Sequence, residues 1–359
     1  AQATGGNYSF FHEVPSFENI GYPIAEIKED GSFYITKHEN TGGLVSTGTV
    51  TAQLLYEISS PDYLNPDVIS HFDTLKIEEV GKDRVYNSPL AESSIIGTAI
   101  GMATLGYKPV VEIQFGDYIW YAMMQLRNEV ATMRYRSNGN WACPLVIRVP
   151  VGGYIHGSLY HSQSIDGYFA HTPGLKVVYP SNASDAKGLL KMACRMDDPV
   201  IFMEHKSLYR QGYAASPEPD DDYLIPFGKS KIVQEGSDLS IITWGAMVQL
   251  TIDAVNDLNI SDNTVEIIDL RTIRPLDYDA IFDSVKKTNR LVILEEAWPF
   301  GNISTDISHT VQSKLFDYLD APPIRVTPPH SSVPYRRPLE ALFVPNKDGV
   351  VSAALEVLE

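Results

Sequence analysis

Three side chains that can do chemistry lie at the ends of predicted strands or helices. Glu92 opens a helical pattern, Tyr118 follows an apolar strand-like run, and His161 follows a glycine-rich loop. A poorly solvated carboxylate at a helix start can be tuned for proton transfer. An imidazole exchanges protons near neutral pH. Positions after the strands of open α/β sheets are where ligands commonly bind.

Each of these residues also has a plain structural interpretation. An acidic residue in the first turn of a helix is favoured by the helix dipole, and an aromatic residue after a strand usually packs in the core. A single histidine is more often structural than catalytic. The loop Gly152–Gly157 before His161 favours a functional role there, because loops at the rim of a rigid scaffold carry much of protein function. The residue types alone leave both interpretations open.

The elements that must position these side chains alternate between strand and helix from about residue 84. The strand-like runs are continuously apolar, which is typical of parallel strands buried on both faces. This β-α-β order predicts an α/β layer with right-handed crossovers. The expected strands are Pro109–Phe115, Pro144–Pro150, Leu175–Pro180 and Pro199–His205, and the expected helices are Glu92–Gly106, Ile119–Ser137 and Asn182–Met196.

A second α/β unit is expected over residues 226–359, after an acidic, proline-containing linker at 212–225. Its strands are short and its helices are of ordinary length, again in β-α-β order. The expected strands are Leu239–Trp244, Val265–Leu270, Leu291–Glu295 and Ile324–Thr327, and the expected helices are Met247–Leu258, Tyr278–Lys287, Ser304–Leu319 and Gly349–Leu358. The first α/β domain then covers residues 84–211.

Residues 1–80 have a different, turn-rich character. Gly31-Ser32 separates two strand-like runs, Tyr22–Lys28 and Phe33–Lys37, which predicts a β-hairpin. A helix-like stretch and a proline-punctuated loop follow, and a β-type run at Thr74–Glu79 closes the segment. We therefore treat residues 1–80 as an atypical, β-rich N-terminal segment.

Composition narrows the class of protein. With 359 residues, 44% hydrophobic and 20% charged, the chain has the composition of an ordinary globular protein. No apolar run approaches the roughly 18 residues that span a bilayer, so no membrane segment is expected. The formal net charge of −17 argues against nucleic acid, since phosphate contacts need clustered Lys and Arg. That charge would suit a basic protein partner, or serve solubility alone.

Two features bear on the compartment. The two cysteines, Cys143 and Cys194, are too few for a disulfide framework, which fits a reducing interior. The N-terminal residues show neither a secretory signal nor an Arg-rich transit pattern. We expect the cytoplasm of a bacterium, or the mitochondrial matrix if a transit peptide has been removed.

Long collinear strings carry a family resemblance. Residues 84–211 resemble the pyrimidine-binding domain of E1 β subunits of thiamine-diphosphate-dependent 2-oxo-acid dehydrogenases, through DRVYNSPLAESSIIGTAIGMA from Asp83, GYKPVVEIQFGDYIW from Gly106, YHSQSIDGYFAHTPGLKVVYPSNASDAKGLLK from Tyr160 and EHKSLYR from Glu204. PFGKSKIVQEGSDLSIITWGAMV from Pro226 and VEIIDLRTIRPLD from Val265 resemble the C-terminal domain shared with transketolases. The resemblance implies two open α/β domains preceded by the atypical segment.

The resemblance implies a role for each candidate residue. Glu92 matches the carboxylate that hydrogen-bonds N1′ of the cofactor's aminopyrimidine and favours its imino tautomer. Tyr118 matches the aromatic residue on which that ring rests. His161 matches a histidine near the substrate channel that helps to receive the lipoyl group.

The resemblance also implies a monovalent-cation site, for K⁺, formed largely by backbone carbonyls. The matching positions are Leu145, Ala193, Met196 and Asp198. Carbonyl ligation leaves no side-chain signature, so these positions depend on the resemblance alone.

The motif for the cofactor's diphosphate is missing. In the family, Mg²⁺ and the diphosphate are held by a GDG motif followed by an Asn, which forms a hard-cation oxygen site. The sequence contains no GDG, and it contains no GxxxxGK[ST] or GxGxxG either. It therefore carries only the half-site for the pyrimidine ring, unlike a single-chain transketolase or deoxyxylulose-phosphate synthase. The resemblance implies an E1 α subunit in an α2β2 assembly with isologous ββ contacts, and an E2 lipoyl acyltransferase as the next partner.

Several alternatives stay open. Tyr168–Pro173 and Glu204–Lys206 lean towards a branched-chain 2-oxo acid as substrate, with pyruvate close behind. The segment Tyr8–Val80, above all KHENTGGLVSTGTVTAQLLYEI from Lys37, resembles the tail of an acyclic terpene utilisation family protein, which indicates a fusion. A hybrid that has lost cofactor binding and acts as an interaction protein is the alternative function. A role of the N-terminal segment in terpenoid or acyl-CoA catabolism is a third.

Overall fold

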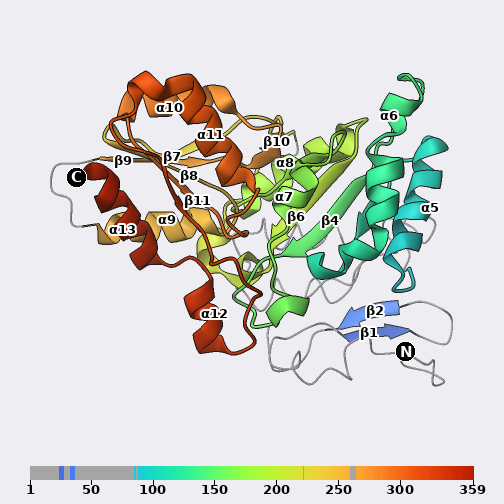
Figure 1. Cartoon of the computed structure of the whole chain (residues 1–359). Helices are drawn as coiled ribbons and strands as arrows, with labels where there is room; N and C mark the ends of the chain where they lie inside the picture. The colour runs from blue at the N-terminus through green and yellow to red at the C-terminus, as the bar shows by residue number, and fades with distance from the viewer. Residues whose placement is uncertain (1–23, 28–32, 37–84, 86–87, 221, 259–263) are drawn as a thin grey trace.

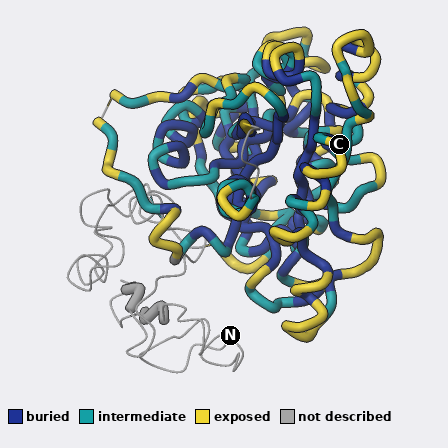
Figure 2. Tube along the Cα trace, turned by 90° about the vertical axis from the view of Figure 1, so that its left-hand side faces the viewer, coloured by how far each residue is buried: buried dark blue, intermediate teal, exposed yellow. Residues whose placement is uncertain are grey.

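Two α/β units lie side by side in the computed structural model (Figure 1). It describes residues 24–27, 33–36, 85, 88–220, 222–258 and 264–359. Each unit contains a five-stranded sheet, in the order β10-β5-β6-β4-β3 for the first and β12-β11-β8-β9-β7 for the second. Figure 2 shows buried residues running through the middle of the molecule, with exposed positions on its outer helices and loops. The predicted pair of α/β domains is confirmed.

The first sheet has helices on both faces. Its parallel strands are β3 (Val110–Glu112), β4 (Val146–Val151), β5 (Lys176–Val178) and β6 (Val200–His205). Alternate strand residues face opposite sides. Val146, Val178 and Phe202 pack with α8 (Ala183–Arg195), whereas Ile147, Val177 and Ile201 pack on the other side with α5 (Glu92–Thr104) and α7 (Asp166–Ala170). This two-sided burial is why the strands read as continuous apolar runs.

The second sheet follows the same rule. Its strands are β7 (Lys231–Gln234), β8 (Leu239–Thr243), β9 (Val265–Asp269), β11 (Leu291–Leu294) and β12 (Ile324–Val326). Helices α10 (Tyr278–Thr288) and α11 (Ile303–Leu315) cover one face, and α9 (Met247–Asp257) and α13 (Lys347–Leu358) cover the other (Figure 1). A short helix, α12 (Arg337–Phe343), lies before α13. One face continues the hydrophobic core of the first sheet, so the two units share a core.

A strand from the second unit completes the first sheet. Strand β10 (Thr272–Arg274) pairs antiparallel with β5, with Thr272 opposite Val178. Strand β10 was not predicted from the sequence, because a segment of three residues shows no strand periodicity of its own. The domain boundaries 84–211, 212–225 and 226–359 stay a prediction.

The predicted helix Ile119–Ser137 is interrupted. The chain forms a 3-10 helix, η1 (Gly116–Ala122), then a π-helical segment, η2 (Gln125–Val130), and then a short helix, α6 (Met133–Arg136). Within residues 1–80, β1 (Ile24–Ile27) and β2 (Phe33–Thr36) pair antiparallel, and each lies within one of the two strand-like runs expected there. The other predictions for that segment, and the join near residues 80–83, lie outside the described residues.

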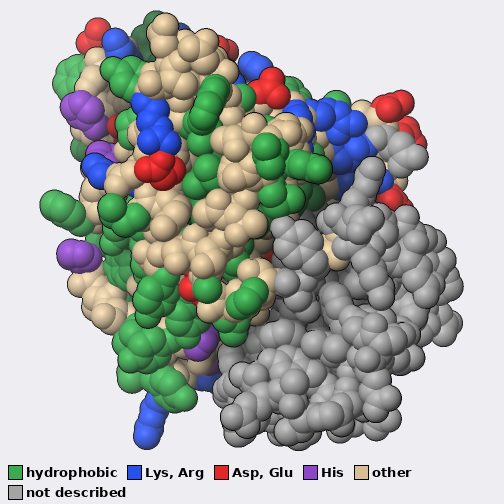
Figure 3. Space-filling model, turned by 90° about the vertical axis from the view of Figure 1, so that its right-hand side faces the viewer, with side chains coloured by type: hydrophobic (Ala, Val, Ile, Leu, Met, Phe, Trp, Pro, Cys, Tyr) green, Lys and Arg blue, Asp and Glu red, His purple; other side chains and the backbone are tan. Residues whose placement is uncertain are grey.

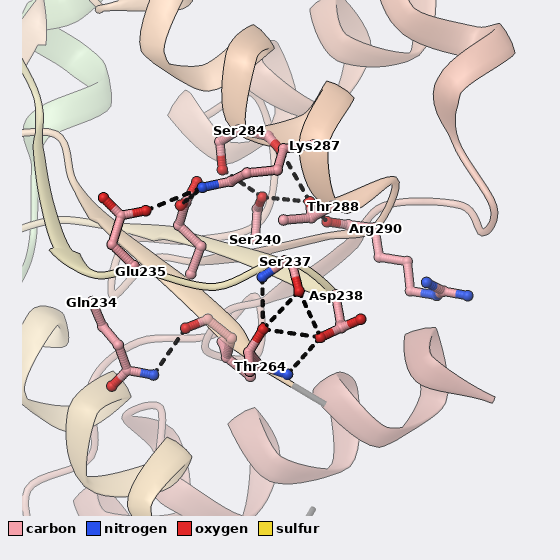
Figure 4. Close-up of polar contacts among 12 residues, drawn as sticks. Gln234, Glu235, Ser237, Asp238, Ser240, Thr264, Ser284, Lys287, Thr288 and Arg290 are labelled. Atoms are coloured by element: carbon pink, nitrogen blue, oxygen red, sulfur yellow. Dashed lines mark hydrogen bonds and ion pairs between the residues drawn. The ribbon is translucent and has the colours of Figure 1, made fainter. Parts of the chain in front are cut away.

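Polar contacts fasten helix α10 to the second sheet (Figure 4). The Ser240 hydroxyl, buried in β8, lies 2.5 Å from that of Ser284 and 2.6 Å from that of Thr288 on α10. The Lys287 ammonium pairs with Glu266 on β9 and with Glu235 beside it. Because buried hydroxyls need partners, this network sets where the helix lies along the strands.

A fully buried ionic triad links three strands of the first sheet. Arg148 on β4 is 0% exposed, donates to Glu204 on β6 at 2.6 Å, and donates to Glu112 on β3 at 2.8 Å. Strand register brings these residues together. Glu112 pairs with Arg148 across β3 and β4, and Glu204 lies two positions along β6 from the residue that pairs with Arg148. The Tyr209 hydroxyl also donates to Glu204, at 2.6 Å. Every charge in the triad therefore has a partner.

We predict that Arg148→Met destabilises the chain by about 3–5 kcal/mol, because it leaves two buried carboxylates without a counter-charge. The matched control is Arg136→Met, whose half-exposed pair with Glu129 should cost about 1 kcal/mol or less. Thermal unfolding measures both. Adding Glu112→Gln and Glu204→Gln should recover much of the loss, and no recovery would show that packing, not charge, is the cause.

Candidate active site

The structure brings Tyr118 and His161 into direct contact. The Tyr118 hydroxyl lies 3.2 Å from Nε2 of His161, and their rings stand nearly perpendicular with centroids 5.5 Å apart. Phe115 supports the imidazole from a centroid distance of 4.5 Å. Both Phe115 and Tyr118 follow strand β3, at its carboxyl end, where ligands bind in open α/β sheets.

Glu92 lies at the first position of α5, which packs against η1. Burial raises the pKa of Tyr118, and the negative charges of Asp117, Tyr121 and Glu92 add to that rise. Glu92 is therefore close enough to Tyr118 for its charge to be felt. The carboxylate is half-buried, and among the described residues none donates a hydrogen bond to it. The three predicted residues thus share one region.

The imidazole of His161 is held in a desolvated setting. Burial lowers its pKa, a hydrogen bond with the Gly157 backbone works in the opposite direction, and the positive charge of Lys206 lowers it further. At neutral pH this favours the uncharged ring. A neutral imidazole can accept a proton or a hydrogen bond at one nitrogen, which is the capacity of a general base.

Asp117 joins η1 to the segment that carries His161. The Gln163 side chain donates to its Oδ1 at 2.7 Å, and its Oδ2 is buried without a partner among the described residues. Burial raises the pKa of Asp117, whereas Lys206 and the hydrogen bonds from Gln163 lower it. Together with the Tyr118 contact, this fastens the 158–165 segment at two points.

Glu296, which follows β11 in the second unit, contacts three segments of the first unit at the site. Its carboxylate lies 2.6 Å from Nε2 of His205 and accepts hydrogen bonds from the Gly153 amide at 2.7 Å and the Ser164 hydroxyl at 3.1 Å. Burial works to raise the pKa of Glu296, but His205 and these donors outweigh it and leave the pKa below its ordinary value. The carboxylate therefore stays charged while it ties three segments of the first unit together.

The loop Gly152–Ser158 has an unusual backbone. Tyr154, His156 and Ser158 all have positive φ, at 67°, 63° and 57°. Such residues cost free energy unless contacts hold them. Glu340 of α12 provides two of these contacts, accepting from the Tyr154 amide at 2.7 Å and pairing with His156, and Ser158 donates to the Val333 carbonyl at 3.2 Å. The second unit therefore determines the path of this loop.

The positions matched to a cation site lie together at one end of α8. The Met196 carbonyl accepts from the Lys108 ammonium at 3.3 Å, and the Ala193 carbonyl accepts from the Met196 amide at 3.1 Å. The Leu145 carbonyl accepts from the Val200 amide at 2.9 Å, and the Asp198 carboxylate pairs with Arg134 at 2.6 Å. Of these carbonyl oxygens, only that of Met196 accepts from a cationic side chain, and those of Ala193 and Leu145 accept from backbone amides, so the cation site stays a prediction.

Several residues of the site were missed from the sequence. Asp117, Lys206, His205, Glu296 and Glu340 come from four separate stretches of the chain, and His205 and Lys206 were singled out only for the lean towards a branched-chain substrate. Asp117 lies directly before Tyr118, within the string from Gly106 that carries the family resemblance, and that position was the only nearby signal. His171 is exposed at the end of α7.

The fold and this arrangement define a transketolase-like class. Residues 228–350 match the family described as transketolase, C-terminal domain. The chain also resembles a solved structure titled split gene transketolase, inactive beta4 tetramer, with a TM-score of 0.67 and 18% identity, over 87% of this chain and 99% of that one. At that identity, the likeness concerns the fold alone.

Sequence relatives define the family within this class. The chain is 42% identical to the 2-oxoisovalerate dehydrogenase subunit beta of Bacillus subtilis (strain 168), over 79% of this chain and 86% of the relative. It is 47% identical to the mitochondrial 2-oxoisovalerate dehydrogenase subunit beta of Dictyostelium discoideum, over 75% and 72%. It is 42% identical to the pyruvate dehydrogenase E1 component subunit beta of B. subtilis, over 79% and 86%. The chain belongs to the β subunits of 2-oxo acid dehydrogenase E1 components.

The N-terminal region resembles a second protein family. Residues 1–118 match the acyclic terpene utilisation family protein AtuA. This supports the fusion indicated by the sequence. The match continues past residue 80, where the sequence analysis ended the atypical segment, and reaches Tyr118.

We predict that Gly152→Ala disrupts the site more than its conformation alone would explain. Gly152 has φ of 92°, and a Cβ there would overlap the His205 ring. Gly106→Ala is a matched control, with φ of 91° and open space around the added carbon. The control should cost about 1–2 kcal/mol and Gly152→Ala about 2–5 kcal/mol, as thermal unfolding would measure. Equal losses would mean that the loop yields easily to the new methyl group.

Proposed function

We propose that this chain is the β half of a thiamine-diphosphate-dependent E1 enzyme, which decarboxylates a 2-oxo acid and passes the acyl group to a lipoyl arm. The observation that supports this most is the grouping of Glu92, Tyr118 and His161 at the carboxyl end of β3, in a member of the E1 β family. Proton transfer and ring stacking, the two tasks expected of them, require such neighbours.

The residues present fit the pyrimidine half of the cofactor. Glu92 offers a half-buried carboxylate that no described residue engages, and Tyr118 offers a half-buried aromatic ring beside it. Thiamine diphosphate, when bound, supplies the nucleophilic carbon for decarboxylation. Glu92 would hydrogen-bond the ring nitrogen N1′, Tyr118 would cover the ring, and His161 would exchange a proton with the lipoyl substrate.

An α subunit completes this proposal. The sequence lacks the GDG motif for Mg²⁺ and the diphosphate, so we infer that an E1 α chain holds them in an α2β2 assembly. Figure 3 shows hydrophobic side chains spread across the face on the side of α5 and α6. Leu105, Tyr107, Met124 and Tyr135 are exposed in this part of the chain. Apolar surface of this kind is typical of protein interfaces.

The finer assignments belong to the same proposal. The acyl acceptor is an E2 lipoyl acyltransferase, and K⁺ is held at the carbonyls of Leu145, Ala193, Met196 and Asp198. The substrate is a branched-chain 2-oxo acid or pyruvate, in keeping with the names of the relatives. The enzyme works in a bacterial cytoplasm or in a mitochondrial matrix. No helix in the described parts of the chain is long and apolar enough to cross a membrane.

A non-catalytic hybrid is the second candidate. The AtuA family match over residues 1–118 includes both Glu92 and Tyr118, which favours a chain whose altered start no longer serves the cofactor. Such a chain would act as an interaction protein. The two candidates differ in one property, which is whether an α partner confers cofactor binding.

We expect thiamine diphosphate and Mg²⁺ to bind tightly only after co-expression with an α chain that contains GDG. The chain alone lacks the charge-assisted contacts to the diphosphate. Calorimetry of the isolated chain and of the assembled enzyme measures the difference. Absence of binding in a correctly assembled complex would favour the non-catalytic hybrid, and micromolar binding to the isolated chain would contradict the half-site.

Glu92→Gln in the assembled enzyme should lower kcat by roughly 10²–10⁴-fold and leave assembly intact. The amide is nearly isosteric but cannot favour the imino tautomer. Glu129→Gln is the control, because Glu129 forms only a partly exposed pair with Arg136. If Glu92→Gln keeps activity within a few-fold of the unaltered enzyme, a different carboxylate serves the cofactor.

A further inference from the structure

Lys206 is a buried cation of the site to which no role has been given so far. It is the first residue after β6 and is 8% exposed. Its ammonium has no hydrogen-bond partner among the described residues. Buried charges are normally paired, since burying one alone is costly. A buried ammonium without a hydrogen-bond partner is therefore a candidate for a functional role in the site.

The surroundings of Lys206 connect it to His161. Its Nζ lies 5.8 Å from the centroid of the Phe115 ring, and that ring supports His161 from 4.5 Å. Asp117, from η1, faces Lys206 with its own Oδ2 unpartnered and its Oδ1 bonded to Gln163. Lys206 therefore interacts with two groups, Phe115 and Asp117, that contact the His161 segment.

The other charged groups around Lys206 are acidic. Glu296, after β11, and Glu340, on α12, attract it from the second unit, as Asp117 does from the first. Burial lowers the pKa of Lys206 to about 8 despite this attraction, so the side chain is still mostly charged at neutral pH. No described carboxylate comes within ion-pair distance of its nitrogen. Its charge therefore acts over space on the groups nearby.

We propose that Lys206 is a positioning residue, which keeps Asp117 ionised as the acceptor for Gln163 and keeps the His161 imidazole neutral beside Tyr118. Both effects follow from one positive charge in a desolvated region, where interactions between charges are strong. An ionised Asp117 holds the segment by the stronger, charge-assisted bond. A neutral His161 can then accept a hydrogen bond from the Tyr118 hydroxyl and exchange protons. The catalytic consequence rests on the proposed function, whereas the effect on titration does not.

The experiment is an NMR titration of the full chain with labelled histidine. His161→Gln identifies the His161 signal among the nine histidines. In Lys206→Met the midpoint should move to higher pH, because the charge that disfavours the imidazolium is gone. Lys206→Arg keeps the charge and should keep the low midpoint. Lys229→Met, at an exposed lysine, should leave the titration unchanged.

Activity gives the second measurement. In the assembled α/β enzyme, the acidic limb of kcat/KM against pH should move to higher pH in Lys206→Met and return in Lys206→Arg. An unmoved His161 midpoint in Lys206→Met overturns the inference. A moved midpoint with an unmoved pH profile would keep the electrostatic link and remove His161 from the chemistry, which contradicts the proposed function instead. If Lys206→Met does not fold, Lys206→Gln serves the same comparison.

Discussion

The Glu296 carboxylate is the contact on which the arrangement of the site depends. A buried carboxylate must be paired and hydrogen-bonded to remain charged. Glu296 meets this need only when His205 at the end of β6, Gly153 after β4 and Ser164 before α7 all converge on it. The segment carrying His161 runs between two of these points. A group in the second unit thus fixes where the candidate catalytic histidine of the first unit lies.

The rest of the interface gives this contact a rigid frame. The Trp244 indole donates to buried Asp166 at 2.7 Å, and Arg271 forms two 2.8 Å hydrogen bonds with Asp185 on α8. Strand β10 joins the first sheet, and one hydrophobic core runs across both units. Gly167 faces Asn302 so closely that a Cβ would collide with it. The two units therefore pack as halves of one body, and the positive-φ loop between them is held on both sides.

Charges in the first unit fall into two groups with different energetics. Arg148, Glu112 and Glu204 are buried in the middle of the sheet and satisfy one another, as a structural ion cluster must. Asp117 and Lys206 follow the carboxyl ends of β3 and β6, and each retains a buried polar atom without a partner among the described residues. Glu92, at the start of α5, is half-buried and accepts no hydrogen bond from a described residue. Unsatisfied groups at such an edge cost stability and are available to a ligand, which is how a site differs from a scaffold.

The sequence by itself determined the layers. Largely apolar runs such as Pro144–Pro150 and Pro199–His205 became central strands, because burial on both faces favours apolar residues, and the charged Arg148 and Glu204 within them are paired with each other. Glu92, Tyr118 and His161 were found through collinear strings, since their spacing alone left a structural interpretation open. Only the tertiary structure decided the break within Ile119–Ser137, the placement of β10 and the grouping of Lys206, Asp117 and Glu296. These depend on contacts between distant stretches of the chain, and no local pattern encodes the partner that each will meet.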